Sequence, residues 1–206
     1  MSRASVLTLG VFISLAGLAL GAEDQFSPNE EGYIRNWLIL APLPLEEGQD
    51  GAAGNNKAQL PDEATMKPKD GAKVNYKGKE LTWKKYQAKE DFVDFNDFLG
   101  AQTEDCDGYA VCYLIVPDEM TGLRLKMGSD DQAKVYINGK ELLKNDMPRP
   151  LTKDEDTAED ITLKKGVNLL VFKVVNEKID FSGSIRFLTK GGEVVRNYKV
   201  ALAPEQ

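Results

Sequence analysis

The stretch Leu125-Lys-Met-Gly-Ser-Asp-Asp-Gln-Ala-Lys-Val-Tyr-Ile-Asn-Gly139 decides the fold class of this 206-residue chain. Apolar and polar residues alternate on both sides of the central aspartates, which is the period-two pattern of half-buried strands. Asn138-Gly139 is the strongest short hairpin signal, because both residues tolerate a positive φ. The stretch therefore predicts two strands joined by a turn at Asp130-Asp131, with a hairpin after the second strand.

Similar patterns extend in both directions along the chain. Tyr109 to Val116 is apolar on both faces and is bounded by Pro117, which predicts a central strand buried on two sides. Further strands are expected at 33–40, 74–76, 81–86, 141–143, 161–163, 167–175, 184–188 and 194–202. A short helix is expected at 62–67, and a helical turn or a short irregular segment within 92–99. The stretch 46–57 is expected to be a flexible surface loop. Together these patterns predict an all-β, jelly-roll-like β-sandwich, a single domain over residues 33–203. Trp37 and Trp83 are expected in its core, with an exposed stacking surface as the alternative.

Composition excludes several classes of function. The chain contains no histidine, which removes His-based catalytic triads and His metal sites. Its net charge of −7 argues against a nucleic-acid partner, which would require clustered basic residues. Neither a glycine-rich phosphate loop nor a CxxC metal pair occurs in the sequence.

The first residues predict a targeting signal. Arg3 precedes an uncharged apolar run from Val6 to Leu20, and Ala19-Leu20-Gly21-Ala22 is a small-x-small arrangement that suits a signal peptidase. We expect a signal peptide at 1–21 and a short segment at 22–32, with an uncleaved anchor as the alternative. The predicted location is secreted or periplasmic, in the cell envelope, with no membrane span in the mature chain.

Two cysteines follow, Cys106 and Cys112. In one extended strand they would stand about 20 Å apart, whereas a disulfide needs Cα atoms within about 7 Å. A turn at Asp107-Gly108 would allow a bridge, and two separate thiols, with Cys112 in the core, are the other arrangement.

The opening stretch resembles the strand, Ser-Asp-Asp turn and Asn-Gly hairpin of galactose-binding-like jelly-roll modules in exported bacterial proteins, including many from planctomycetes. Asn36-Trp-Leu-Ile-Leu-Ala-Pro-Leu43 looks like their opening strand, and Leu163-Lys-Lys-Gly-Val-Asn-Leu-Leu-Val-Phe-Lys173 like a later strand pair. The resemblance covers most of residues 33–188 and implies a non-catalytic binding role, often for carbohydrate. The chain departs from the pattern where an aromatic residue, often Trp, is expected at Tyr136 and near Phe181, and a glycine at Gln132, which weakens the case for a sugar-stacking platform.

The candidate metal ligands are Asp130 and Asp131. The turn is similar to that of PA14-like sandwiches, in which an Asp-Asp pair binds calcium, and carboxylate oxygens suit Ca²⁺. In the alternative, the two carboxylates cap the turn by accepting nearby backbone N–H groups.

The candidate ligand-binding residues are Tyr136, Arg149 and Asp156. Tyr136 alternates with the apolar set and is expected to point outward. Arg149 lies between two prolines, and its guanidinium suits carboxylate or sugar oxygens. If the fold brings Arg149 and Asp156 beside Asp130, they would form a polar crevice.

The leading hypothesis is a secreted, non-catalytic β-sandwich that binds a glycan or another envelope component, with Ca²⁺ as its only candidate cofactor. A cell-surface scaffold for structural or protein contacts is the first alternative. A glycoside-cleaving enzyme is the second, and it would need two carboxylates at a defined separation inside a cleft. A groove joining Tyr136, Arg149 and the aspartate turn would favour ligand binding, whereas a flat apolar patch would favour a protein partner.

Overall fold

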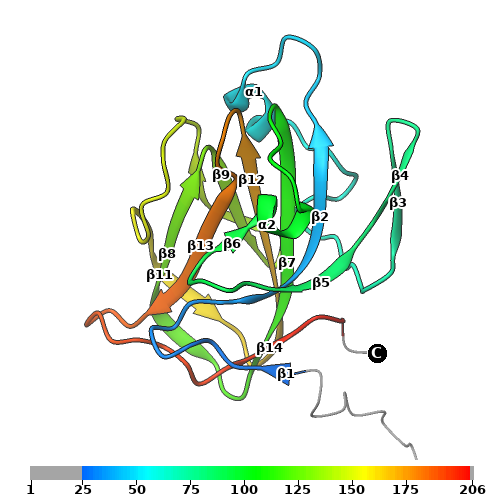
Figure 1. Ribbon diagram of the computed structural model, residues 1–206. Helices are drawn as coiled ribbons and strands as arrows, with labels where there is room; N and C mark the ends of the chain where they lie inside the picture. The colour runs from blue at the N-terminus through cyan, green and yellow to red at the C-terminus, as the bar shows by residue number, and fades with distance from the viewer. Residues whose placement is uncertain (1–24, 205–206) are drawn as a thin grey trace, which may run out of the picture.

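The computed structural model describes residues 25–204, and the predicted signal peptide lies outside this range. Two antiparallel sheets face each other (Figure 1). The large sheet contains β1 (Gln25–Phe26), β14 (Lys199–Ala201), β7 (Cys106–Val116), β12 (Gly166–Asn176), β9 (Ala133–Ile137), β10 (Lys140–Asn145), β2 (Asn36–Pro44) and β5 (Lys84–Gln87). The small sheet contains β11 (Asp156–Leu163), β8 (Met120–Asp130), β13 (Ser182–Leu188) and β6 (Val93–Asp94). The predicted all-β sandwich is confirmed.

Four further elements lie outside these two sheets. β3 (Lys73–Tyr76) and β4 (Lys79–Thr82) form a separate two-stranded hairpin, which projects at the right of Figure 1. The helices are α1 (Gly51–Asn56) and α2 (Phe95–Leu99). Neither is long and apolar enough to cross a membrane, nor is any other helix of the described residues.

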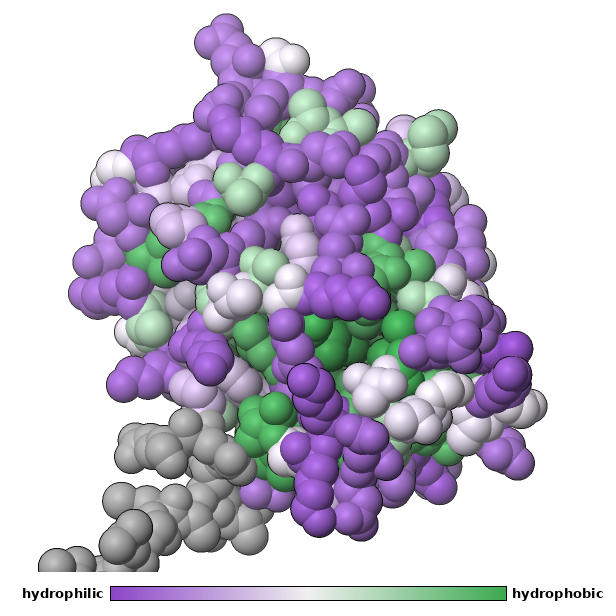
Figure 2. Space-filling view, turned by 180° about the vertical axis from the view of Figure 1, so that it is seen from behind, coloured by the Kyte–Doolittle hydropathy of each residue, from purple (hydrophilic) through white to green (hydrophobic). Residues whose placement is uncertain are grey.

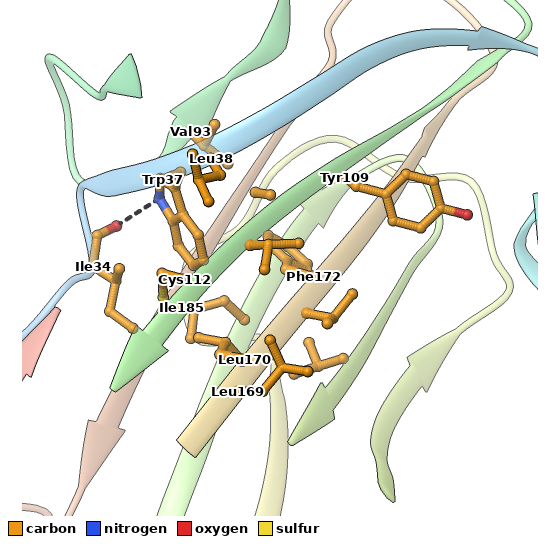
Figure 3. Close-up of a cluster of buried hydrophobic side chains, with 14 of the residues drawn as sticks. Ile34, Trp37, Leu38, Val93, Tyr109, Cys112, Leu169, Leu170, Phe172 and Ile185 are labelled. Atoms are coloured by element: carbon orange, nitrogen blue, oxygen red, sulfur yellow. Dashed lines mark hydrogen bonds between the residues drawn. The ribbon is translucent and has the colours of Figure 1, made fainter. Parts of the chain in front are cut away.

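The core lies between the sheets, as the alternation predicts. β7 pairs with β12 along its whole length, and its residues are buried on both faces apart from the partly exposed Ile115. Trp37 packs against Phe172 with ring centroids 6.3 Å apart, and its indole N–H donates to the Ile34 carbonyl at 3.1 Å (Figure 3). Trp83 is buried as well.

Both cysteines belong to β7 and are free and buried. A strand continues through Asp107-Gly108, so the turn that a disulfide would require does not form. Burial raises the pKa of both thiols, which keeps them in the unreactive protonated form.

The segment 45–72, here called the covering segment, crosses the outer face of the large sheet. It contains α1, where an open loop was expected at 46–57. Asp50 caps α1 by accepting the Ala53 N–H at 2.8 Å, and Asn55 donates to the Asn145 carbonyl at 2.9 Å. A Cβ on Gly51 would lie 2.1 Å from the Gln132 side chain, so this glycine permits close packing. The glycine-rich composition here reflects close approach to the sheet.

Several boundaries differ from the expected ones. Residues 61–65 form turns where a helix was expected at 62–67, and the helix expected within 92–99 is shortened by β6 to α2. The 22–32 segment contributes β1, which pairs with β14 and joins the sandwich.

Candidate functional site

A cleft of about 320 Å³ opens beside the last residue of β8. We call it the Asp130 cleft. It lies at the upper end of the sandwich in Figure 1, where β8 ends and β13 begins. Its lining combines four polar with four apolar residues: Asp94, Asp130, Asp180, Ser182, Phe92, Pro150, Leu151 and Phe181.

Strand pairing brings these distant segments together. Ser182, the first residue of β13, pairs with Asp130 on one side and with Asp94 of β6 on the other. The Phe95 N–H donates to the Phe181 carbonyl at 2.8 Å, and the Phe95 and Phe181 rings stack at 4.4 Å. The floor of the cleft is therefore part of the small sheet and its aromatic support.

The Asp130-Asp131 turn fastens two loops to this floor. The Asp130 carboxylate accepts the Leu151 N–H at 3.2 Å, and the Asp131 carboxylate accepts the N–H groups of Arg149 at 3.2 Å and Glu177 at 2.9 Å. These bonds are the capping of backbone N–H groups that was the alternative to metal binding. The N–H donors belong to other loops and not to the turn itself. The two aspartates therefore position the walls of the cleft.

The carboxyl group of Asp130 has a raised pKa. The residue as a whole is only 7% exposed. Burial, followed by the neighbouring Asp131 charge, raises the pKa of Asp130 to about 6. The group is thus an ionised acceptor near neutral pH and loses its charge in mildly acidic solution.

The structure brings Arg149 and Asp156 together, close to the aspartate turn. The Arg149 guanidinium bonds to the Asp156 carboxylate and donates to the Ser129 hydroxyl at 3.0 Å. It also lies 3.3 Å from the Glu155 carboxylate. These contacts engage both terminal nitrogens of the guanidinium, while its Nε has no partner among the described residues. Arg149 therefore holds the loop before β11 against β8, and neither Arg149 nor Asp156 lines the Asp130 cleft.

Tyr136 lies elsewhere and does not line the Asp130 cleft. It does face away from the core between the sheets, but the covering segment lies over it. Its hydroxyl donates to the Glu63 carboxylate at 3.0 Å. Burial and the charge of Glu63 raise the pKa of Tyr136. Alternation along the strand predicted the face correctly and carried no information about the segment that covers it.

Calcium does not fit the aspartate turn as it stands. Ca²⁺ takes six to eight oxygen ligands, whereas both oxygens of Asp131 and one of Asp130 already accept backbone N–H groups. Within residues 25–204, no group of three Asp, Glu, Cys or His side chains could hold a metal ion. We therefore derive no role for calcium at this site.

Comparisons with known proteins do not assign the chain to a family. No family model and no curated protein matches the chain. Among solved structures, a GH31 alpha-xylosidase from Xanthomonas citri is similar with a TM-score of 0.30 and 12% identity, over 87% of this chain and 19% of that chain. The chain therefore spans about a fifth of the length of that enzyme. A TM-score of this size assigns neither a family nor a function.

Sequence reasoning identified Asp130 and missed the rest of the cleft. Phe92, Asp94, Asp180 and Ser182 lie in segments far from the aspartates in sequence. The aromatic residue expected near Phe181 from the resemblance was the single signal that pointed there. Pairing between β6, β13 and β8 would have been needed to find the others.

Proposed function

We propose that the chain is a non-catalytic binding module that acts outside the cytoplasm and takes a carbohydrate unit, or another hydroxyl-rich envelope component, in the Asp130 cleft. The observation that carries the proposal is the nearly buried Asp130 carboxylate in the lining of this cleft. The exported jelly-roll modules that the sequence resembles agree with such a role.

The chemistry of the lining supports this ligand class. Carboxylates accept hydrogen bonds from sugar hydroxyls, and such charge-assisted bonds are stronger than neutral ones. Phe92, Pro150 and Leu151 offer apolar surface to the C–H groups of a sugar ring. The volume, about 320 Å³, lies near the lower end of the range for small-molecule sites, which suits one or two rings.

The test compares the wild-type chain with Asp130→Asn on a glycan array, followed by calorimetric titration of any retained glycan. Asparagine keeps the size and the acceptor for the Leu151 N–H, so we expect at least about tenfold weaker binding with little change in folding. Asp118→Asn is the matched control, because Asp118 is highly exposed and lies in the turn before β8. Wild-type binding should also weaken as the pH falls through about 6, the pKa of Asp130.

Two results would contradict the proposal. One is the absence of any retained glycan on the array, and the other is a retained glycan whose affinity Asp130→Asn leaves unchanged. Parallel titrations with added Ca²⁺ and with a chelator complete the design. A calcium-dependent affinity would mean that the carboxylates of the turn exchange their backbone partners for a metal.

A glycoside-cleaving enzyme is the second candidate, and the raised pKa of Asp130 favours it. A carboxyl that titrates near neutral pH is suited to act as a general acid, and Asp94 and Asp180 lie in the same cleft. The assay is the release of reducing ends from any glycan that binds. Turnover that Asp130→Asn abolishes and Asp118→Asn leaves intact would establish the enzyme and overturn the non-catalytic role.

A scaffold for protein contacts gains little support from the surface. Figure 2 shows a mostly hydrophilic face with hydrophobic residues gathered in its lower middle part, partly overlaid by hydrophilic ones. Among the described residues, three large hydrophobic side chains are exposed, those of Met147, Ile179 and Val194. A few exposed apolar side chains are normal on monomeric proteins.

A further inference from the structure

One short segment of this acidic chain is strongly basic. Residues 67–89 contain eight lysines and two acids, while the rest of the chain has 18 Lys and Arg against 31 Asp and Glu. The segment comprises the β3–β4 hairpin, β5 and the chain on either side. All eight lysines are exposed: Lys67, Lys69, Lys73, Lys77, Lys79, Lys84, Lys85 and Lys89.

The β3–β4 hairpin projects from the body of the protein (Figure 1), and its lysines, Lys73, Lys77 and Lys79, are exposed. Tyr76 is buried, and Val74 and Leu81 pack against the hydrophobic core, so apolar residues attach the hairpin to the sandwich. The tight turn at Lys77-Gly78 has positive φ at both residues. The lysines of the hairpin therefore face the solvent.

Acidic residues neutralise a minority of this charge. Lys73 pairs with Glu80 at 2.8 Å, and Lys89 pairs with Asp97 of α2. The Lys77 ammonium donates to the Pro44 carbonyl at 3.1 Å. Within the part of the chain that the structure describes, four others have neither an ion pair nor a side-chain hydrogen bond: Lys67, Lys69, Lys79 and Lys84. We call these four residues the lysine surface. They remain uncompensated in a protein with a large excess of carboxylates.

Protection of an exposed strand edge explains part of the pattern. β5 is an edge strand of the large sheet, and lysines on edge strands discourage pairing with other chains. This explanation fits Lys84. It does not apply to Lys67 and Lys69, which lie in no strand.

We infer that the lysine surface binds a linear polysaccharide that carries repeated carboxylate or sulfate groups. The inference is independent of the Asp130 cleft, because the two sites share no residue. Lysine ammonium groups act as point charges that attract anions without demanding a fixed geometry. A flexible chain with regularly repeated anionic groups can contact several of them at once.

Other polyanions fit the surface less well. Single-stranded nucleic acids are bound by stacking bases on exposed aromatic rings. Tyr76 and Trp83 of this segment are buried, and the partly exposed Tyr86 packs edge-on against Phe98 and donates its hydroxyl to Asp97. Stable attachment to an anionic membrane needs an apolar anchor beside the basic patch, and the exposed large hydrophobic residues lie outside 67–89. The negative charge on the rest of the molecule would repel a polyanion and so direct it to the hairpin.

The experiment measures binding of the full chain to immobilised dextran sulfate and polygalacturonate, with neutral dextran as the reference. The test variant is Lys69→Gln/Lys79→Gln/Lys84→Gln. The control variant is Lys140→Gln/Lys164→Gln/Lys190→Gln, which removes the same charge from exposed lysines elsewhere. Thermal unfolding of each variant shows that it is folded.

We expect the wild-type chain to bind one or both charged polymers and not dextran, with an affinity that falls steeply as salt increases. The test variant should bind at least about tenfold more weakly and with a shallower salt dependence, and the control variant should stay within about twofold. The two polymers distinguish a preference for carboxylate from one for sulfate.

Several results would overturn the inference. Equal losses in the two variants would mean that binding depends on net charge alone. Tighter binding to a 30-nucleotide single strand or to phosphatidylserine vesicles would assign the surface to another class of partner. No binding to either charged polymer, or binding that the test variant retains, would leave edge protection as the function of these lysines. None of these results depends on Asp130, so a failed cleft proposal stays distinguishable.

Discussion

Asp107 and Lys173 lie on the outer face of the large sheet, and neither side chain has any exposed surface. Their charged atoms are 4.0 Å apart, and neither Asp107 oxygen has a hydrogen-bond partner within the described residues. Burial raises the pKa of Asp107 to about 7, although the charge of Lys173 acts to lower it. A buried carboxylate without hydrogen bonds is costly, so the protonated form of Asp107 is favoured in the folded state.

This residue predicts a pH dependence of stability. The folded pKa lies above the ordinary value of 3.8, so the stabilising contribution is complete below about pH 3.8 and is lost as the pH rises through about 7. Each unit of pKa shift corresponds to about 1.4 kcal/mol. Asp107→Asn should therefore flatten the fall of Tm between pH 5 and pH 8, as measured by calorimetry.

Asp130 and Asp131 also have raised pKa values, so the informative quantity is the difference between wild type and variant. The exposed Asp118→Asn should leave the pH profile unchanged. An Asp107→Asn profile parallel to that of the wild type would show that Asp107 keeps its ordinary pKa in the folded protein.

At the scale of elements, the covering segment depends on one buried cation. The Lys173 ammonium donates to the carbonyls of Gly54 at 2.8 Å and Lys57 at 2.7 Å, and to the Glu63 carboxylate at 3.4 Å. Glu63 also accepts the hydroxyls of Tyr109 at 2.5 Å and Tyr136 at 3.0 Å. These bonds connect the covering segment to β7, β9 and β12.

Lys173→Met should destabilise the protein by about 3–5 kcal/mol, because it leaves the buried Glu63 carboxylate without its cation. Urea unfolding provides the measurement. The double variant Lys173→Met/Glu63→Gln should recover part of the loss. Lys165→Met, which removes an exposed pair with Asp118, should cost at most about 1 kcal/mol. A cost for Lys173→Met no larger than that would mean that the ion pair contributes nothing to the attachment.

The covering segment also shows where prediction from the sequence stopped. The period-two patterns predicted the major strands, because a strand buried on one face must alternate. No such pattern indicated that the covering segment is ordered, or which face of the large sheet it covers. Gly51 and Gly54 looked like flexible positions, yet a Cβ at either would lie within 2.5 Å of a neighbouring side chain. A single sequence does not distinguish a glycine that permits close packing from a glycine that permits flexibility.

At the scale of the whole molecule, the spacing between the two sheets depends on a small residue. Gly183 of the small sheet lies directly over Phe172 of the large sheet, and a Cβ there would be 2.4 Å from the Phe172 ring. Gly183→Ala should therefore destabilise the protein by about 1–3 kcal/mol through overpacking.

Gly191→Ala is the matched control, because a Cβ at Gly191 would be no closer than 3.6 Å to any neighbour. Thermal unfolding of the two variants separates the overpacking from the general effect of replacing glycine. Equal Tm values would show that the sheets can move apart at no cost.

The candidate site was less predictable than the fold, because it is formed by segments that are far apart in the sequence. Asp130 could be identified because it interrupts a regular alternation. Arg149 and Asp156 were considered as partners of Asp130 in one crevice. They pair with each other close to the aspartate turn, but they do not line the cleft. The cleft itself is formed by four separate stretches of chain, whose meeting depends on the pairing of β13 with both β8 and β6. Spacing along one strand cannot encode that arrangement.

The pairing of β1 with β14 has a practical consequence for handling the protein. Gln25 pairs with Ala201, so the two strands nearest the chain ends run antiparallel along one border of the large sheet. Figure 1 shows this border at the opposite end from the tip of β8. An affinity tag or biotin attached at β1 or β14 would therefore immobilise the protein with the Asp130 cleft facing the flowing sample.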